Sequence, residues 1–214
     1  MQCSTVSDVA PIAGRKPPTF LFDLGGVLYD TATFRDLRMM LVTDLPDDAL
    51  KARWLGSPAV RAFELGRVSP QEFGTAIVDE WRIPVSPEEF VARMAGFVKH
   101  PCPGAEALLA RLRANHVVCC LSNSNALHWE RVGSFLDCFD SAFSSHLLGE
   151  IKPDEAAFRK VMGLLGVEAE SLWFFDDSRP NVAAAERLGI RSFLVDGVPA
   201  IERVLRAEGV ISGG

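Results

Sequence analysis

The chain lacks the long apolar run that a membrane-spanning helix requires. Such a helix needs about 18 or more consecutive apolar residues, and no stretch of the 214-residue sequence approaches that length. Positive charge is not in surplus either, since 22 lysines and arginines face 28 aspartates and glutamates, for a net charge of −6. We therefore expect no membrane insertion, and no nucleic-acid binding as the main purpose.

Cysteine is scarce, and its spacing shows no pairing pattern. The five cysteines are an odd number and contain no C-x-x-C spacing, which argues against a disulfide framework and against a zinc site. Cys119 and Cys120 lie within an apolar run, and successive residues of a strand point to opposite faces. We expect reduced thiols on the two faces of one buried strand, and a cytoplasmic location.

The N-terminal residues 1–18 contain no continuous apolar segment. They do not match a secretory signal, and their composition predicts a flexible tail. The first strong element is the apolar run at 19–23, which ends in Asp23 and leads into Gly25 and Gly26. This pattern predicts a buried strand that delivers a carboxylate into a glycine-rich loop.

From about residue 31 to 100, helical periodicity replaces the strand pattern. Ser69-Pro70-Gln71-Glu72 and Ser86-Pro87-Glu88-Glu89 each combine an N-cap serine, a proline at the first helical position and a glutamate at the third. These are capping boxes and mark helix starts, and Ser57-Pro58 repeats the first half of the signal. We expect about four short helices here, without short buried strands.

After residue 101, short apolar runs alternate with helical stretches. The further strands are predicted at 117–121, 141–144, 172–175 and 191–195. Strands that alternate with helices form a parallel sheet covered on both faces. The sequence therefore predicts an α/β fold. Its core is built from residues 19–30 and 101–214, and residues 31–100 are inserted as a helical cap.

Unusual polar residues follow the predicted strands, at the sheet edge where open parallel sheets bind ligands. In chain order they are Asp23, Ser122, Asn123, Lys152, Asp176 and Asp177. Three carboxylates gathered at one edge would repel one another unless a cation compensates, and Mg²⁺ binds carboxylate and carbonyl oxygens. The metal, the lysine and the serine would form a cradle for a phosphoryl group, with Asp23 as the candidate nucleophile.

Four motifs in this order resemble those of the haloacid dehalogenase (HAD) superfamily. They are Phe22–Leu28 (FDLGGVL), Leu121–Asn123 (LSN), Lys152-Pro153 and Phe175–Ser178 (FDDS). Together with Phe63–Arg67 (FELGR), they are similar to bacterial α-glucose-1-phosphate phosphatases and to the amino-terminal phosphatase domain of soluble epoxide hydrolases. The resemblance implies a HAD-like Rossmannoid sheet with an inserted α-helical cap.

The resemblance also implies a role for each matched position. Asp23 would be the nucleophile and a metal ligand, and the Gly25 carbonyl a backbone metal ligand. Asp177 would bind Mg²⁺ directly, and Asp176 directly or through water. Ser122 and Asn123 would bind phosphoryl oxygens, and Lys152 would link nucleophile and phosphate. The implied activity is Mg²⁺-dependent hydrolysis of a small phosphorylated metabolite, with a sugar phosphate as first candidate, through an aspartyl-phosphate intermediate.

One position departs from the superfamily pattern. Most of its phosphatases carry an aspartate two residues after the nucleophile, as general acid and base, and this chain has Gly25 there. Such a group is typically worth ~10²–10⁴-fold in rate. A good leaving group, a cap residue or an ordered water could compensate, or the protein could be a weakly active or non-catalytic phosphate-binding module.

One further interpretation of the activity stays open at this stage. A metal-independent haloacid dehalogenase would use the same nucleophile on carbon, but it would not need the acidic pair Asp176-Asp177. Among other polar residues, His128 is more readily a packing or surface histidine than a cleft acid. Trp54, Glu64 and Arg67 could touch substrate or simply pack, so no role is assigned to them. The sequence does not indicate the oligomeric state.

Overall fold

The structure is a computed structural model that describes residues 18–31, 34–41 and 43–212. The expected N-terminal tail at 1–18 therefore lies, apart from residue 18, outside the described residues. Within the described ranges, no helix is both long and apolar enough to cross a membrane.

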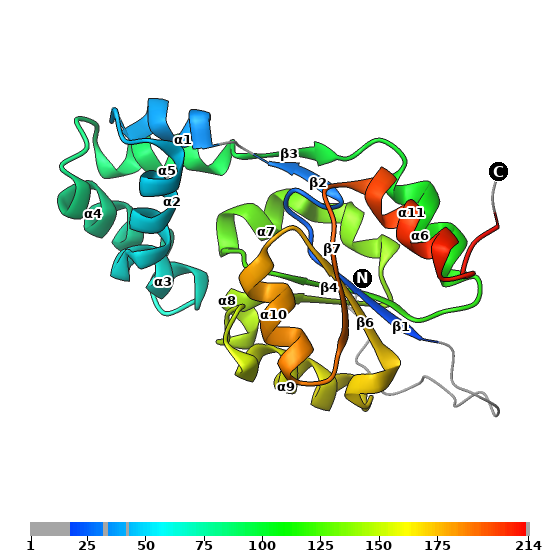
Figure 1. The fold of residues 1–214 in the computed structure, drawn as a ribbon. Coiled ribbons are helices and arrows are strands. Elements are labelled where there is room, and N and C mark those ends of the chain that lie inside the picture. The colour runs from blue at the N-terminus through cyan, green and yellow to red at the C-terminus, as the bar shows by residue number, and fades with distance from the viewer. Residues whose placement is uncertain (1–17, 32–33, 42, 213–214) are drawn as a thin grey trace.

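The centre of the fold is a parallel sheet with the strand order β5-β4-β1-β6-β7 (Figure 1). Its strands are β1 (Thr19–Phe22), β4 (Val118–Ser122), β5 (Ser141–Ser144), β6 (Leu172–Asp176) and β7 (Arg191–Leu194). The central strand β1 pairs with β4 on one side and with β6 on the other. Because both faces of a parallel sheet are covered, the three inner strands β4, β1 and β6 are mainly apolar and buried, and the parallel sheet confirms the predicted α/β class.

Helices cover both faces of the sheet, as expected. The elements whose side chains join β1 in one apolar cluster are α6 (Ala105–Arg113), α7 (Ala126–Val132), η1 (Gly133–Cys138) and α11 (Val198–Ala207). A second cluster involves α8 (Ser145–Leu148), α9 (Glu155–Leu165) and α10 (Arg179–Arg187), with the short turn η2 (Ala169–Ser171) beside it. Cys120 belongs to the first cluster and Cys119 to the second, so the predicted strand faces are confirmed.

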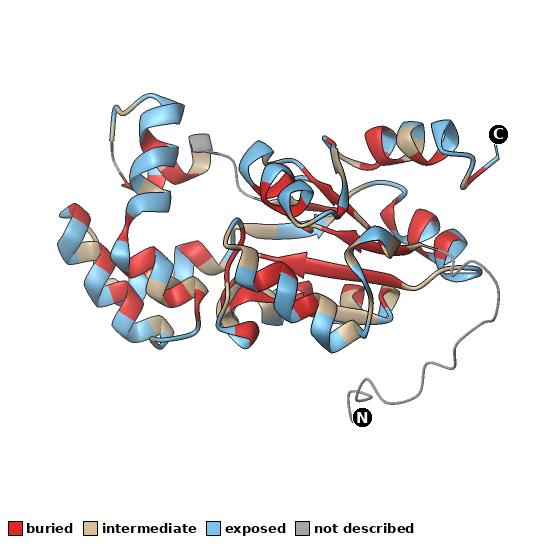
Figure 2. Ribbon diagram, turned by 60° about the horizontal axis from the view of Figure 1, so that its bottom comes forward, coloured by how far each residue is buried: buried red, intermediate tan, exposed pale blue. Residues whose placement is uncertain are grey.

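The insert between β1 and β4 forms a third, separate apolar cluster. Its helices are α1 (Phe34–Leu41), α2 (Asp47–Gly56), α3 (Pro58–Glu64), α4 (Pro70–Trp81) and α5 (Pro87–Ala95), one more than the sequence indicated. They lie together beside the carboxyl edge of the sheet (Figure 1). Their buried residues, red in Figure 2, form the apolar cluster. We refer to α1–α5 as the cap.

The two predicted capping boxes in the cap differ in which hydrogen bonds they form. At Ser69 the full capping box is present, since its hydroxyl accepts the Glu72 N–H and the Glu72 carboxylate accepts the Ser69 N–H at 2.8 Å. At Ser86 only the first bond is made, from the Glu89 N–H at 3.2 Å. The Glu89 carboxylate pairs instead with Arg93 one turn along the helix, because an i,i+4 partner of opposite charge competes for it.

A small antiparallel ribbon joins the two halves of the molecule (Figure 1). It consists of β2 (Tyr29–Thr31) and β3 (Val98–Pro101), which pair across the two points where the chain passes between sheet and cap. Neither strand is fully buried, so the ribbon adds two partly exposed strands at the edges of the 31–100 segment without contradicting the expectation of no short buried strands there. Strands of three or four residues with mixed polarity carry too little periodicity to be recognised in the sequence.

Candidate active site

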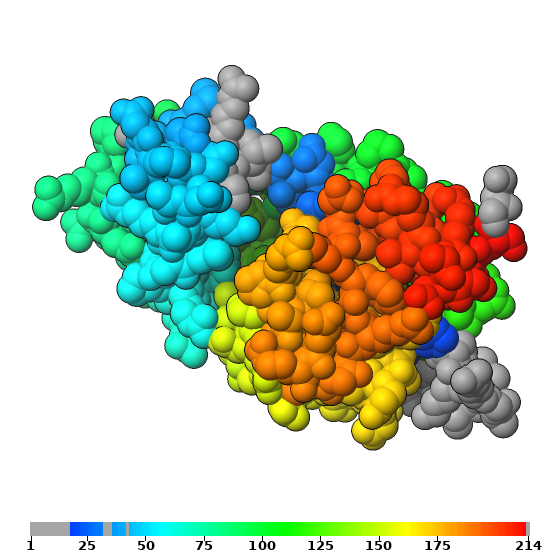
Figure 3. All heavy atoms as spheres, in the orientation of Figure 1, coloured from blue at the N-terminus to red at the C-terminus, as the bar shows by residue number. Residues whose placement is uncertain are grey.

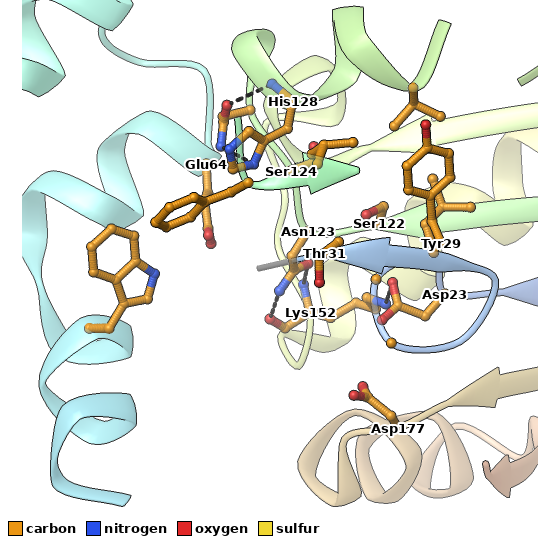
Figure 4. A pocket seen from close by; sticks show the side chains of 18 of the residues that line it. Asp23, Tyr29, Thr31, Glu64, Ser122, Asn123, Ser124, His128, Lys152 and Asp177 are labelled. Carbon is orange, nitrogen blue, oxygen red and sulfur yellow. Dashed lines mark hydrogen bonds and ion pairs between the residues drawn. The ribbon is translucent and has the colours of Figure 1, made fainter. Parts of the chain in front are cut away.

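The structure brings the predicted site residues to the carboxyl edge of the sheet. Asp23 directly follows β1, and Ser122 and Asp176 are the last residues of β4 and β6. A cavity of about 670 Å³ lies there, and the predicted residues that line it are Asp23, Gly25, Ser122, Asn123, Lys152 and Asp177. The surface is hollowed where the cap meets the core (Figure 3). The close view shows the side chains of Asp23, Ser122, Asn123, Lys152 and Asp177 on the core side (Figure 4).

A buried lysine lies between two carboxylates at the back of the cavity. The Lys152 Nζ atom is 3.0 Å from Asp23 Oδ1 and 2.7 Å from Asp176 Oδ2. Asp176 is completely buried and also accepts the Ser178 N–H at 2.8 Å and the Asn181 Nδ2 at 3.0 Å. With each oxygen of Asp176 already satisfied, this carboxylate chiefly anchors the lysine beside the nucleophile candidate.

The electrostatics of the cluster favour a cation. Burial raises the pKa of Asp23 to about 7; Lys152 opposes the shift, while Asp176 and Asp177 add to it. Burial and the neighbouring Asp176 also raise the pKa of Asp177. Burial lowers the pKa of Lys152, but its two carboxylate partners outweigh burial and hold the pKa above its usual value. One lysine thus leaves the three carboxylates undercompensated.

The acidic residues fit a divalent metal. Ligand oxygens of Asp23, Asp176 and Asp177 all lie within 4.8 Å of one another. Opposite oxygens around Mg²⁺ are about 4.2 Å apart, so the spacing of these carboxylates is close to that around one shared ion. At Gly26 the backbone has φ +75°, and a β-carbon there would be 2.7 Å from Asp177 Oδ2. Glycine is therefore what allows the loop after β1 to approach the acidic pair.

The Asn123 side chain hydrogen-bonds to the protein backbone. Its Nδ2 donates to the Lys152 carbonyl at 2.7 Å, and its Oδ1 accepts the Lys152 N–H at 2.9 Å. The residue thereby fixes the peptide that carries the lysine. Direct phosphoryl binding by Asn123, implied by the family resemblance, remains a prediction. Ser122 has no such engagement and lines the cavity.

The helix after β4 is not capped by Ser122 or Asn123. The N-cap residue is Asn125, whose Oδ1 accepts the His128 N–H at 3.1 Å. The His128 ring is also held on both sides, by the Met94 carbonyl at 2.9 Å from Nε2 and by Asn125 Nδ2 at 3.1 Å from Nδ1. Since a carbonyl only accepts, Nε2 carries the proton. This ring connects α7 of the core to α5 of the cap, in agreement with a packing role.

The cap supplies cavity-lining residues to which the sequence assigned no role. They are Leu37, Asp47, Trp54, Glu64 and Met94. Helical periodicity places such residues on a face, but it cannot say whether that face meets the cap interior or the core. The FELGR segment was the one sequence signal pointing to Glu64.

The fold and the site define the class together: a parallel sheet gathers a strand-end aspartate, a buried lysine and an acidic pair at one edge, the arrangement that the sequence predicted for a HAD-like hydrolase. The chain belongs to the haloacid dehalogenase-like hydrolase family, whose family model matches residues 17–189.

Curated relatives and solved structures agree with this assignment. The chain is similar to phosphatase MT3486 of Mycobacterium tuberculosis, with 30% identity over 82% of this chain and 86% of the relative. It is also similar to the sesquiterpene phosphatase astK of Aspergillus oryzae, with 26% identity over 79% of this chain and 85% of that relative. A HAD family enzyme from Bacteroides thetaiotaomicron, solved with magnesium and inorganic phosphate, superposes with a TM-score of 0.68 at 25% identity over 83% of this chain and 93% of that one.

Proposed function

We propose that the protein is a Mg²⁺-dependent phosphomonoesterase that works through an aspartyl-phosphate on Asp23. The observation that carries this proposal is the position of Asp23, 3.0 Å from the Lys152 ammonium and close enough to Asp177 for one cation to bind both. The phosphatase names of two relatives and the magnesium and phosphate of the Bacteroides structure support the same reaction.

The proposed reaction begins with an Asp23 carboxylate oxygen attacking phosphorus, while the ester P–O bond breaks. Lys152, held by Asp176, presents its positive charge to the nucleophile and the phosphoryl oxygens, and Ser122 donates a hydroxyl hydrogen bond. Bound Mg²⁺, held by Asp23, Asp177 and the Gly25 carbonyl, would offset the repulsion between the anionic nucleophile and the phosphoryl group. Water then cleaves the acyl phosphate and restores Asp23.

The organic part of the substrate would face the cap. The sequence suggested a sugar phosphate, whose hydroxyls require hydrogen-bond partners. On the cap side, however, three of the five lining residues named above are apolar or aromatic, namely Leu37, Trp54 and Met94, and Asp47 is already paired with Arg38. Buried polar groups without partners are costly, so this wall favours an alcohol with an apolar body. We propose that the cap selects such esters over free sugar phosphates.

A phosphate-release screen tests the proposed function. The panel contains sugar phosphates, nucleotides and prenyl or aryl phosphates, each with Mg²⁺ and with EDTA. Phosphate release that requires Mg²⁺ is the expected result, with higher kcat/KM on the apolar esters. Halide release from haloacids in EDTA would instead indicate a dehalogenase. Phosphate binding without turnover of any ester would indicate a non-catalytic module.

Replacing the nucleophile gives the largest single effect on activity. Asp23→Asn removes the attacking carboxylate while keeping its size, and we expect kcat to fall at least ~10³-fold. Transfer of ³²P from a labelled ester to the wild-type protein, absent in the variant, would locate the intermediate. Turnover near the wild-type rate in Asp23→Asn would exclude this mechanism.

A further inference from the structure

The residues assigned so far leave two proton transfers without a group to perform them. The alkoxide released from an alkyl phosphate needs a proton, and the water that cleaves the acyl phosphate must lose one. Gly25 has no side chain to do either. Given the proposed phosphomonoesterase activity, on which this inference rests, another group in the cavity must exchange these protons.

Most titratable side chains in the cavity are already committed or unsuited. Those that line it are Asp23, Tyr29, Asp47, Glu64, His128, Lys152 and Asp177. Asp47 pairs with Arg38, and burial raises the pKa of Tyr29 above its ordinary value, which makes it a weaker acid. Both ring nitrogens of His128 are hydrogen-bonded. Asp23, Lys152 and Asp177 belong to the nucleophile and metal cluster. Glu64 is left.

Glu64 stands at a sharply defined helix end. It is the last residue of α3, and Gly66, with φ +68°, follows in the left-handed conformation. The Gly66 N–H donates to the Phe63 carbonyl at 3.0 Å, and the Arg67 N–H donates to the Ala62 carbonyl at 2.9 Å. This pair of bonds is a Schellman motif. The FELGR segment therefore holds the Glu64 backbone in one place.

The same helix end is pressed against the core. A β-carbon at Gly66 would lie 2.2 Å from the His146 carbonyl oxygen, so glycine permits a contact that other residues would block. One turn earlier, Arg61 pairs with Asp154 of the core at 2.5 Å. Glu64 lies at this contact and points into the space between cap and core (Figure 4). It makes no hydrogen bond or ion pair with any residue that the structure describes.

The environment of Glu64 suits proton exchange near neutral pH. Loss of hydration raises the pKa of its carboxyl to about 7, and the positive charge of Arg61 opposes this shift. The other charged groups lining the cavity are Asp23, Asp47, Lys152 and Asp177. A group with a pKa near the working pH is both available as an acid and effective as a base.

We propose that Glu64, reaching from the cap, is the general acid and base that the core lacks at Gly25. In the first step Asp23 forms its bond to phosphorus, the ester P–O bond breaks, and the Glu64 carboxyl gives its proton to the departing oxygen, which leaves as the alcohol. In the second step the Glu64 carboxylate takes a proton from water as that water attacks phosphorus and the Asp23–phosphorus bond breaks. Inorganic phosphate leaves and both carboxyls are restored.

Leaving-group dependence is the decisive test. In Glu64→Gln with Mg²⁺, we expect kcat on an alkyl phosphate to fall about 10²–10⁴-fold, with KM changed less than about threefold. With p-nitrophenyl phosphate, nitrophenolate leaves without an acid, so one equivalent should appear in a burst, followed by slow turnover because water lacks its base. Glu64→Asp should recover part of the alkyl-phosphate rate, because it restores a carboxyl at this position.

Matched variants separate this role from others. Glu89→Gln changes an exposed cap glutamate outside the cavity and should leave kcat unchanged. Gly25→Asp in the Glu64→Gln background should restore at least tenfold on alkyl phosphates, since a β-carbon there is 3.5 Å from its nearest neighbour, the Thr31 methyl. Full kcat of Glu64→Gln on alkyl phosphates, or equal loss without a burst on both esters, overturns the proposal. If wild-type protein hydrolyses no ester, the proposed function itself fails.

Discussion

The two walls of the cavity differ in how their charged groups are held. On the core side, Lys152 contacts two carboxylates at 3.0 Å or less, and Asp176 is fully buried and fully hydrogen-bonded. On the cap side, Glu64 has no hydrogen-bond or ion-pair partner among the described residues, and the apolar side chains of Leu37 and Met94 line the same wall. Charges that are bonded on all sides are held in fixed positions, whereas an unpaired carboxyl is free to gain and lose a proton. In the proposed reaction, the core therefore fixes the reacting atoms, and the cap provides both selectivity and proton exchange.

The buried lysine should contribute far more to stability than an exposed one. Lys152→Met leaves Asp23 and Asp176 facing each other without a counter-charge, and removing one partner of a buried pair costs about 3–5 kcal/mol. The exposed pair between Lys99 and Asp30 of the ribbon, at 3.6 Å, offers the control, because such pairs contribute at most ~1 kcal/mol. Urea unfolding of both methionine variants at pH 8 measures the difference. Equal losses would contradict the contrast between buried and exposed charge.

The glycine beside the acidic pair should be the next most sensitive position. Gly26→Ala places a methyl in a left-handed residue and against the Asp177 carboxylate, which should cost about 1–2 kcal/mol of stability. Asp177 must also turn away, so the Mg²⁺ concentration for half-maximal activity should rise. Gly56→Ala, at a cap glycine with nothing within 4 Å of the new methyl, should change neither quantity appreciably. An unchanged Mg²⁺ requirement in Gly26→Ala would separate Asp177 from the metal.

The histidine between cap and core should make stability depend on pH. Burial lowers the pKa of His128 below 6.5, with its backbone partner Met94 opposing and Arg131 adding to the shift. Because the unfolded chain takes up a proton before the folded one, the contribution of His128 is present above about pH 6.5 and is lost as the pH falls. The slope has an upper bound of ~1.4 kcal/mol per pH unit.

The difference between wild type and His128→Gln isolates this effect. Denaturant unfolding at pH 7.5, 6 and 5 gives the free energy of unfolding of both proteins. The pKa values of His116 and His146 are also lowered by burial, but these residues are present in both chains and cancel. We expect the difference in free energy of unfolding between wild type and His128→Gln to narrow as the pH falls. A constant difference would contradict a neutral His128 ring with both nitrogens hydrogen-bonded.

The sheet was predictable from the sequence, and the cap was predictable only in outline. β1, β4 and β6 are buried on both faces, so each is an apolar run, and its ends in the structure lie within one residue of those predicted from the sequence. The end of α7 at Val132 had no clear sequence signal; Gly133 leaves the helical conformation with φ 52° and a 3₁₀ turn follows. Short elements such as α8 and the ribbon depend on tertiary packing and left no pattern.

The candidate site was predictable where it depends on topology. Parallel strands end at one edge, so the sequence alone suffices to place residues such as Asp23 and Lys152 together. Two features could not be foreseen. Asn123 bonds the Lys152 peptide because of how two loops pack, and Glu64 reaches the cavity because of how the cap docks on the core. Both depend on contacts between segments far apart in the chain.

The His128 ring, which is hydrogen-bonded through both of its nitrogens, gives the molecule a natural spectroscopic probe. The chain has four histidines, so imidazole nitrogen resonances are few enough to resolve by NMR. The ring proton on Nε2 is shared with the Met94 carbonyl, 2.9 Å away on the other half of the molecule. The chemical shift of this nitrogen and the solvent exchange of its proton therefore report whether the hydrogen bond between core and cap is kept while a substrate analogue is titrated in. No label on the cap is needed.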